Sequence, residues 1–140
     1  MSVDCIDTSV LVSAMIESEK GHTACRRLIV AGGMRMYAHG IVETFSTLTG
    51  GQKPFRMSPD AAHSLVEDHF APRLEIVILT PGETLRAMRE CKSRGVRGGV
   101  VYDFLHLMAA RKAKAARLYT LNVAHFRAFH RPGEQEIVHP

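Results

Sequence analysis

Short apolar segments alternate with segments of helical periodicity along the chain, and this alternation restricts the possible folds more than any other feature. The connections between the apolar segments are too long to be hairpin turns. Antiparallel neighbours are usually joined by tight turns, whereas parallel strands need long crossovers that are commonly helical. The pattern therefore predicts an α/β fold with a parallel sheet of four to five short strands, flanked by helices on both faces.

The boundaries of these elements follow from periodicity and from helix start and stop signals. Ser58-Pro59 and Thr80-Pro81 predict helix starts, because Ser or Thr can cap a helix and Pro is tolerated in its first turn. Glu83 completes a capping box with Thr80. The expected strands are 3–6, 34–38, 74–79, 118–120 and 136–138, of which 74–79 is the clearest. The expected helices are 10–16, 22–31, 39–48, 59–70, 81–93, 100–116 and 122–129.

Length and composition predict one folded domain over residues 1–140. Apolar residues make up 46% and charged residues 23% of the chain, which is typical of a globular protein rather than a disordered one. There is neither an apolar run of the roughly 18–20 residues that a membrane span needs nor a charged signal-peptide start. The three cysteines share no C-x-x-C spacing, which argues against a disulfide framework or zinc site and suits a reducing cytoplasm.

Positive charge is concentrated in residues 86–117, which we call the basic segment. Nine Lys or Arg against two acids give this segment a formal charge of +7, while the rest of the chain carries −3. Such asymmetry suits a polyanionic partner such as RNA, and Arg94 and Arg97 are the candidate contacts. A solvated basic face is the alternative explanation.

Four polar residues occupy similar positions in this predicted architecture. Asp7 follows the first strand, Glu43 lies one helical turn after the second, and Asp103 begins the helix after a glycine-rich break. Asn122 follows the strand that ends at Thr120. Because the carboxyl ends of parallel strands lie along one edge of a sheet, we expect these side chains to converge there.

Oxygen ligands of this kind suit Mg²⁺, which usually takes one or two carboxylates together with water and substrate phosphate. Each residue also has a simpler interpretation. Asp7 and Asn122 could be helix caps, Asp103 could interact with a helix N-terminus, and Glu43 could face bulk water. Small and polar residues follow Glu43 at helical spacing, and the apolar face of the same helix is formed by Ile41, Phe45 and Leu48. This arrangement favours the interpretation in which Glu43 points into an open cleft. His106, one turn beyond Asp103, could reach that cleft or simply pack.

The sequence resembles the PIN-domain ribonucleases, in particular the VapC toxins of prokaryotic toxin–antitoxin pairs. The resemblance rests on four segments in order: Asp7-Thr8-Ser9-Val10-Leu11, Val42-Glu43-Thr44-Phe45-Ser46-Thr47-Leu48-Thr49, Tyr102-Asp103-Phe104-Leu105-His106-Leu107-Met108-Ala109-Ala110 and Leu118-Tyr119-Thr120-Leu121-Asn122-Val123-Ala124-His125-Phe126. It implies a PIN fold and Mg²⁺- or Mn²⁺-dependent endonucleolytic cleavage of structured RNA, such as transfer RNA or a ribosomal RNA loop. It also implies a VapB-like antitoxin that blocks the acidic cleft and a homodimer, assembling with antitoxin as a heterotetramer or larger complex.

The resemblance matches Asp7, Glu43 and Asp103 to the three family acids, which are the expected metal ligands. The fourth position departs, since family members often have an acid where this chain has Asn122 or His125. Asn122 can still supply an amide oxygen to the catalytic set, and His125 could contact phosphate or lie on the surface. The hydroxyl groups of Ser9 and Thr120 are candidate supporting groups.

Two functions compete at this point. The first is a metal-dependent endoribonuclease toxin. The second is an inactive PIN-like module that binds RNA through the basic segment without cutting it. Retention of all three acids favours the enzyme, because clustered carboxylates repel one another and serve no purpose in an inactive module.

Overall fold

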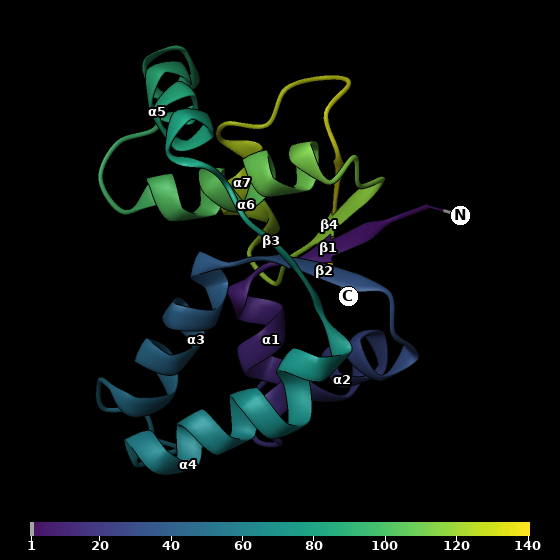
Figure 1. Cartoon of the computed structure of the whole chain (residues 1–140), viewed down its shortest axis with the longest axis vertical. Helices are drawn as coiled ribbons and strands as arrows, with labels where there is room; N and C mark the ends of the chain where they lie inside the picture. The colour runs from purple at the N-terminus through teal and green to yellow at the C-terminus, as the bar shows by residue number, and fades with distance from the viewer. Residues whose placement is uncertain (1) are drawn as a thin grey trace.

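A computed structural model describes residues 2–140 as a five-stranded parallel sheet with helices on both faces (Figure 1). The strand order is β3-β2-β1-β4-β5, so β1 lies at the centre. The strands are β1 (Asp4–Ile6), β2 (Met34–Tyr37), β3 (Glu75–Val77), β4 (Arg117–Tyr119) and β5 (Glu136–Val138). This architecture confirms the predicted α/β class, and the central position of β1 places Asp7 at the middle of the carboxyl edge.

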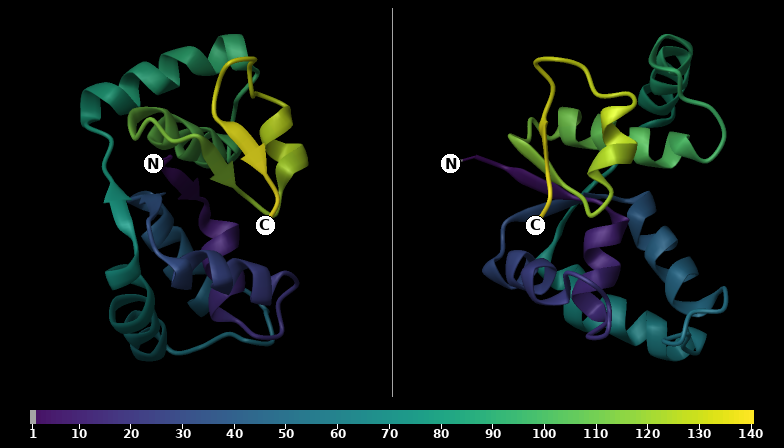
Figure 2. Two further views of the ribbon diagram at one scale, coloured as in Figure 1. Left: turned by 90° about the vertical axis from the view of Figure 1, so that its right-hand side faces the viewer. Right: turned by 180° about the vertical axis from the view of Figure 1, so that it is seen from behind.

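The helices divide into two groups, one on each face of the sheet. Figures 1 and 2 show α5, α6 and α7 on one side and α1 to α4 on the other. The helical segments are α1 (Thr8–Met15), α2 (His22–Ala31), α3 (His39–Thr49), α4 (Pro59–Ser64), the π-helical turn η1 (Leu65–Phe70), the 3₁₀ turn η2 (Ala71–Arg73), α5 (Pro81–Arg94), α6 (Val100–Lys112) and α7 (Val123–Arg127). Within residues 2–140, none of these helices combines the length and apolar character needed to cross a membrane.

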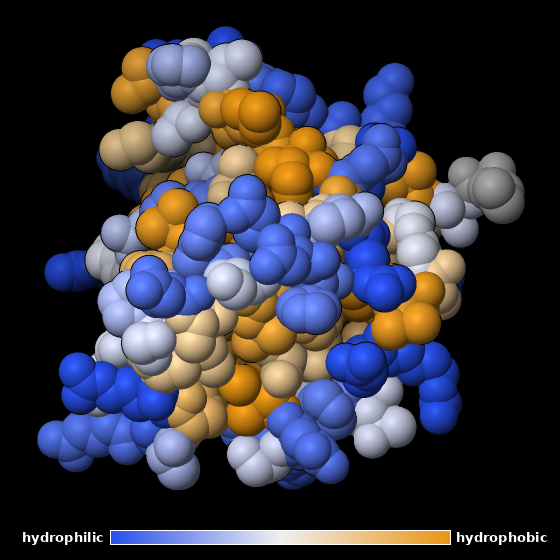
Figure 3. Space-filling view, turned by 60° about the horizontal axis from the view of Figure 1, so that its bottom comes forward, coloured by the Kyte–Doolittle hydropathy of each residue, from blue (hydrophilic) through white to orange (hydrophobic). Residues whose placement is uncertain are grey.

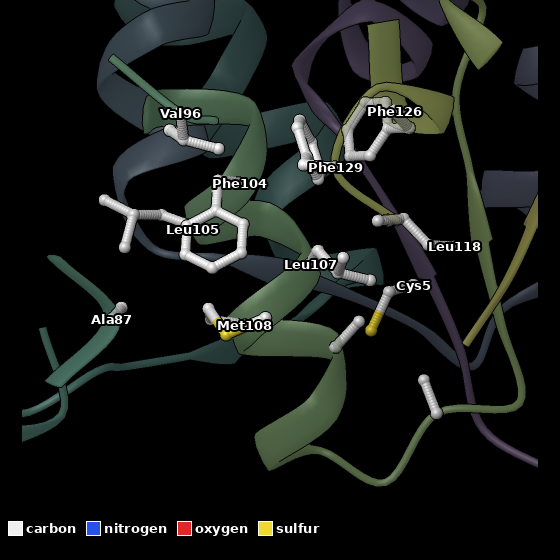
Figure 4. Close-up of a cluster of buried hydrophobic side chains, with 12 residues drawn as sticks. Cys5, Ala87, Val96, Phe104, Leu105, Leu107, Met108, Leu118, Phe126 and Phe129 are labelled. Atoms are coloured by element: carbon white, nitrogen blue, oxygen red, sulfur yellow. The ribbon is translucent and has the colours of Figure 1, made fainter. Parts of the chain in front are cut away.

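The central strand supplies side chains to both faces, because successive residues of a strand point in opposite directions. Cys5 belongs to the core beneath α5, α6 and α7, which Figure 4 shows around Phe104 and Phe126. Ile6 belongs to the core beneath α1 and α2. Phe104 is fully buried, and truncating such a side chain to Ala costs about 3–5 kcal/mol. Apolar packing on both faces therefore fixes the strand whose end carries Asp7.

The predicted strand 74–79 is shorter than expected. Only Glu75–Val77 pairs, at the edge of the sheet, and Ile78 is 65% exposed. Its partner β2 ends at Tyr37 and gives way to α3, so the backbone beyond Val77 has no strand to pair with. The apolar run that made this strand look clear is therefore partly a surface feature.

Two predicted helices also differ from the structure at their ends. The helix expected over 59–70 becomes π-helical at Leu65–Phe70. A 3₁₀ turn follows at Ala71–Arg73, where Pro72 cannot donate the hydrogen bond that a continuing α-helix requires. The helix expected over 100–116 ends at Lys112, because Lys114 adopts a left-handed conformation with φ of 55°. The turn lets the Ala116 amide bond the Val3 carbonyl at 2.7 Å, which leads the chain into β4.

Candidate active site

Asp7 is held in one orientation by three hydrogen bonds. Its Oδ1 accepts from the Ser9 hydroxyl at 2.6 Å and from the Val10 amide at 3.2 Å. Its Oδ2 accepts from the Thr120 hydroxyl at 2.6 Å. The bond from the Val10 amide makes Asp7 the N-cap of α1, as the simpler interpretation predicted. The side chain is nevertheless only 2% exposed, and capping alone does not require three donors.

The same hydroxyl groups hold the chain where it leaves β4. Ser9 Oγ accepts from the Leu121 amide at 3.0 Å, and Thr120 Oγ1 accepts from the Asn122 amide at 3.0 Å. Ser9 and Thr120 therefore support Asp7, and they tie the ends of β1 and β4 together. Asn122 occupies the N-cap position of α7, yet within residues 2–140 its side chain makes no capping hydrogen bond.

Asp7, Asp103 and Asn122 line one open cleft of about 420 Å³. Asp103 lies in the first turn of α6, and its side chain is 32% exposed. His125 stands at the rim, with Nδ1 3.9 Å from Asp103 Oδ2 and a side chain that is 69% exposed. Lys20 and Lys53 also line the cleft, as does a third acid, Glu19.

Glu43 is bound by its neighbours rather than by solvent. Its Oε1 accepts from the Thr8 hydroxyl at 3.2 Å and lies 3.0 Å from His106 Nε2. His39 Nδ1 lies 3.4 Å from the same oxygen, one helical turn earlier. His106 is 2% exposed, so packing and contact with the acid are combined in one residue. The alternative that Glu43 simply faces bulk water is wrong.

The packed face of α3 explains how Glu43 comes close to His106. Gly40, Thr44 and Leu48 are the buried residues of this helix. A Cβ at position 40 would clash with the His106 ring, so glycine allows the close approach of α3 to α6. The predicted apolar face included Phe45, which is instead 37% exposed, whereas Leu48 of that face is buried.

Asp103 and Glu43 have pKa shifts in opposite directions. Burial, and then the negative charge of Asp7, raise the pKa of Asp103 despite the opposing influence of His106. Burial acts to raise the pKa of Glu43 as well, but the hydrogen bond and charge of His106, with a further contribution from His39, outweigh it and lower the pKa. Glu43 is therefore readily ionised, and the charge of Asp103 is the one left uncompensated.

The donor set of the cleft fits a hard divalent cation. Within the part of the chain that the structure describes, no three His, Cys, Asp or Glu side chains are placed to hold one ion together. Mg²⁺ needs only one or two carboxylates, because it keeps several waters. Asp7 and Asp103 provide two carboxylates, Asn122 provides an amide oxygen, and a cation would offset the repulsion that raises the pKa of Asp103. Glu43 lines the adjoining hollow and would act through water.

The sequence matches known proteins over most of its length. A family model described as PIN domain matches residues 5–130. The chain belongs to the PIN-domain family. The ribonuclease VapC40 of Mycobacterium tuberculosis is 35% identical to this PIN domain over 123 residues, which cover 81% of this chain and 82% of that protein.

Solved structures show the same fold. VapC20 of Mycobacterium tuberculosis, described as a sarcin–ricin loop cleaving toxin, has a TM-score of 0.71 at 15% identity and covers 94% of this chain and 98% of its own. VapBC2 of Rickettsia felis, solved bound to a promoter DNA fragment, has a TM-score of 0.68 at 17% identity, with coverage of 99% and 98%. The PIN fold that the sequence resemblance implied is thereby confirmed.

Four of the nine cations in the basic segment of this PIN domain form ion pairs in the folded chain. Arg94 is bound to Glu134 at 2.7 Å and to the Phe129 carbonyl at 2.9 Å, and its side chain is only 9% exposed. These bonds satisfy its guanidinium, so the prediction that Arg94 contacts RNA is wrong, whereas Arg97 is exposed and stays a candidate. Three further cations of the segment form ion pairs: Arg111 with Glu90, Lys112 with Glu83 and Arg117 with Asp4.

Sequence reasoning missed several residues that the PIN domain brings to the site. His39 stands four residues before Glu43 in one helix, a spacing that places both on one face and could have been noticed. Lys20 and Lys53 gave no such signal, because each lies in a polar stretch far from the acids in sequence. Their place beside the cleft depends on how the turn after α1 and the loop after α3 fold back.

Proposed function

We propose that this chain is a metal-dependent endoribonuclease toxin of the VapC type. On this proposal residues 1–140 form one PIN domain that acts in the cytoplasm on structured RNA, such as transfer or ribosomal RNA. The observation that carries the proposal is the pairing of Asp7 and Asp103 in one open, polar cleft, from elements 96 positions apart in the chain. Membership of a family whose relatives include VapC ribonucleases supports it.

The reaction would be hydrolysis, in which a water oxygen bonds to phosphorus while the bond to the leaving oxygen breaks. A bound Mg²⁺ or Mn²⁺ would supply acidification of that water and stabilisation of charge on the phosphate. Asp7 and Asp103 would hold the cation, with Asn122 as a neutral oxygen ligand. Glu43, kept ionised by His106, would orient water at the edge of the cleft. Lys20 and Lys53 would attract the RNA phosphates that the acids repel.

A nuclease of this kind requires inhibition in the cell, and we propose a VapB-like antitoxin as its partner. The solved VapBC2 structure is a complex of this type, and its toxin fold covers nearly the whole of this chain. Exposed apolar side chains on two helices, Val42 and Phe45 on α3 and Leu85 and Met88 on α5, offer contact surface for an antitoxin or a second copy. Figure 3 shows apolar side chains gathered between hydrophilic ones on one face of the molecule. We propose a homodimer that assembles with antitoxin into a heterotetramer or larger complex.

The inactive RNA-binding module is the weaker alternative. It depended on the basic segment as the RNA surface, and four of the nine cations of that segment are paired with acids. The cleft, in contrast, keeps Asp7 and Asp103 close enough that the charge of Asp7 adds to burial in raising the pKa of Asp103. Such a cluster is costly to maintain without a cation, which favours the enzyme.

The test is to express the chain with and without its co-encoded partner and to map new RNA 5′ ends. We expect new ends only when the partner is absent, and none with Asp7→Asn or Asp103→Asn. Asp60→Asn is the matched control, because Asp60 is an exposed acid in α4 and lines neither the cleft nor the adjoining hollow. Undiminished cutting by a folded Asp7→Asn or Asp103→Asn protein would refute the assigned roles, and the new ends would identify the RNA.

A further inference from the structure

A second hollow adjoins the acidic cleft. Its volume is about 370 Å³, within the range of small-ligand sites, and Thr47 lines both spaces. Tyr102 and Asp103 are consecutive in α6, so one faces the hollow and the other faces the cleft. The lining residues are His39, Val42, Glu43, Ser46, Thr47 and Tyr102.

One wall of this hollow is built from stacked aromatic rings. Tyr102 stacks on His39 with ring centroids 5.2 Å apart and an interplanar angle of 6°. His39 in turn stacks on Tyr37 at 6.1 Å. Tyr102 is 46% exposed although its ring stacks on His39, so part of this side chain remains accessible to a ligand in the hollow.

We propose that this hollow binds an unpaired nucleobase of the RNA, from a nucleotide beside the scissile phosphate. The inference rests on the proposed ribonuclease function and names the recognition site that would accompany it. Proteins recognise single-stranded RNA chiefly by stacking splayed bases on aromatic side chains and by hydrogen bonding to their edges. Tyr102 extends the ring stack onto the base, and Val42 gives the apolar contact from α3.

The polar groups of the hollow select a base over a phosphate. Glu43 presents a carboxylate, which repels an anion but accepts hydrogen bonds from the N–H groups of a base. Ser46 and Thr47 add hydroxyl groups that both donate and accept. Because Thr47 lines both spaces and Asp103 directly follows Tyr102, a base in the hollow would leave its own phosphate at the acidic cleft. The hollow therefore sets the position along the RNA at which the cleft acts.

Three variants separate this role from general surface effects. Tyr102→Ala removes the stacking face, Tyr102→Phe keeps it, and Ile78→Ala removes an exposed apolar side chain that does not line the hollow. Affinity is measured by fluorescence anisotropy with a short labelled single-stranded RNA of mixed sequence, in EDTA, so that binding is read without cutting. Because base–aromatic stacking is worth about 1–3 kcal/mol, Tyr102→Ala should weaken binding by about 5- to 150-fold. The other two variants should bind within about twofold of the native chain.

An abasic scan of the RNA then identifies the stacked position. At one position next to the mapped cut, an abasic nucleotide should weaken binding to the native chain and have no further effect with Tyr102→Ala. The proposal is refuted if Tyr102→Ala binds RNA like the native chain, or if this substitution weakens only binding of the partner protein. It is also refuted if the loss of RNA affinity caused by Tyr102→Ala adds to the loss caused by an abasic nucleotide at every position. A native chain that binds in this pattern yet never cuts would refute the ribonuclease assignment and leave the base site standing.

Discussion

Replacing Thr120 by Val tests whether the hydrogen bonds around Asp7 hold the active site together. Thr120 is fully buried, and its hydroxyl donates to Asp7 Oδ2 at 2.6 Å. Val has nearly the same volume, so the substitution removes the hydroxyl with little change in packing. Asp7 Oδ2 then loses its donor, which is the only one to this oxygen among the hydrogen bonds of the described residues.

The expected magnitude follows from the charge of the acceptor. Hydrogen bonds to charged groups contribute about 1.5–3 kcal/mol, against about 0.5–1.5 kcal/mol for neutral pairs. Thr44 is an equally buried threonine whose hydroxyl donates to a neutral acceptor, the Gly40 carbonyl, at 2.7 Å. Thr120→Val also removes the acceptor of the Asn122 amide, a neutral bond of 3.0 Å. It should therefore lower the free energy of unfolding by about 2–4.5 kcal/mol, and Thr44→Val by about 0.5–1.5 kcal/mol.

Urea unfolding measures both losses, provided the m-value is unchanged between variants. Thr120→Ser keeps the donor and should recover most of the stability, less about 0.8 kcal/mol for the lost methyl group. In an Asp7→Asn background the cost of Thr120→Val should fall to that of two neutral bonds, about 1–3 kcal/mol. RNA cleavage should fall with Thr120→Val and return with Thr120→Ser. Equal losses for Thr120→Val and Thr44→Val, or no dependence on Asp7, would refute this account.

Three further predictions concern the charges around the site. Asp103 has a higher pKa in the folded chain than in the unfolded one, so stability falls as pH rises from the ordinary carboxyl range through the raised pKa. Asp103→Asn should therefore raise the melting temperature at pH 7 in EDTA, and added Mg²⁺ should stabilise only the native chain; a Mg²⁺ response retained by the variant would contradict the ligand assignment. Arg94→Met removes the ion-pair partner of Glu134, which keeps its bond from the Arg131 amide, and should cost about 1.5–3 kcal/mol in urea unfolding. Arg97→Met should change stability by under about 0.5 kcal/mol and reduce the salt dependence of RNA affinity. Equal effects of Arg94→Met and Arg97→Met on the free energy of unfolding would show that the burial of Arg94 does not determine its contribution to stability. His125→Ala should slow single-turnover cleavage if the imidazole assists at Asp103, and an unchanged rate would leave His125 as a surface residue.

Much of the fold was predictable because its signals are local. The helix over 22–31 and the strand over 136–138 have the predicted bounds, and the capping box of Thr80 and Glu83 forms as expected. The common edge for Asp7 and Asp103 followed from the parallel topology alone. The errors lie where a neighbour decides the outcome: β3 stops where β2 stops pairing, which no pattern within 74–79 could reveal.

Charge was predicted least well, because a sum over residues says nothing about pairing. The basic segment has a formal charge of +7, yet Asp4, Glu83 and Glu134 from outside it neutralise three of its cations. Conversely, Lys20 and Lys53 attracted no notice in the sequence and line the acidic cleft. The positive charges available to RNA are therefore the five exposed cations of the segment that these ion pairs leave, Arg97 among them, together with Lys20 and Lys53 at the cleft.

The acids of the site could be predicted from the sequence, but the properties of Glu43 depend on residues that only the tertiary fold brings to it. His106 is 63 residues away in the chain, and its ring meets Glu43 only because Gly40 lets α3 approach α6. The contact lowers the pKa of Glu43, while Asp103 one turn before His106 has a raised pKa. One buried histidine thus leaves the two carboxylates with different proton affinities, so that a cation in the cleft would be needed mainly for the pair Asp7 and Asp103. If the ion is held mainly by Asp7 and Asp103, Glu43→Gln should reduce Mg²⁺-dependent stabilisation less than Asp103→Asn does. Three equivalent carboxylate ligands would instead predict equal losses. Equal losses in a thermal-shift titration would show that Glu43 binds the ion directly.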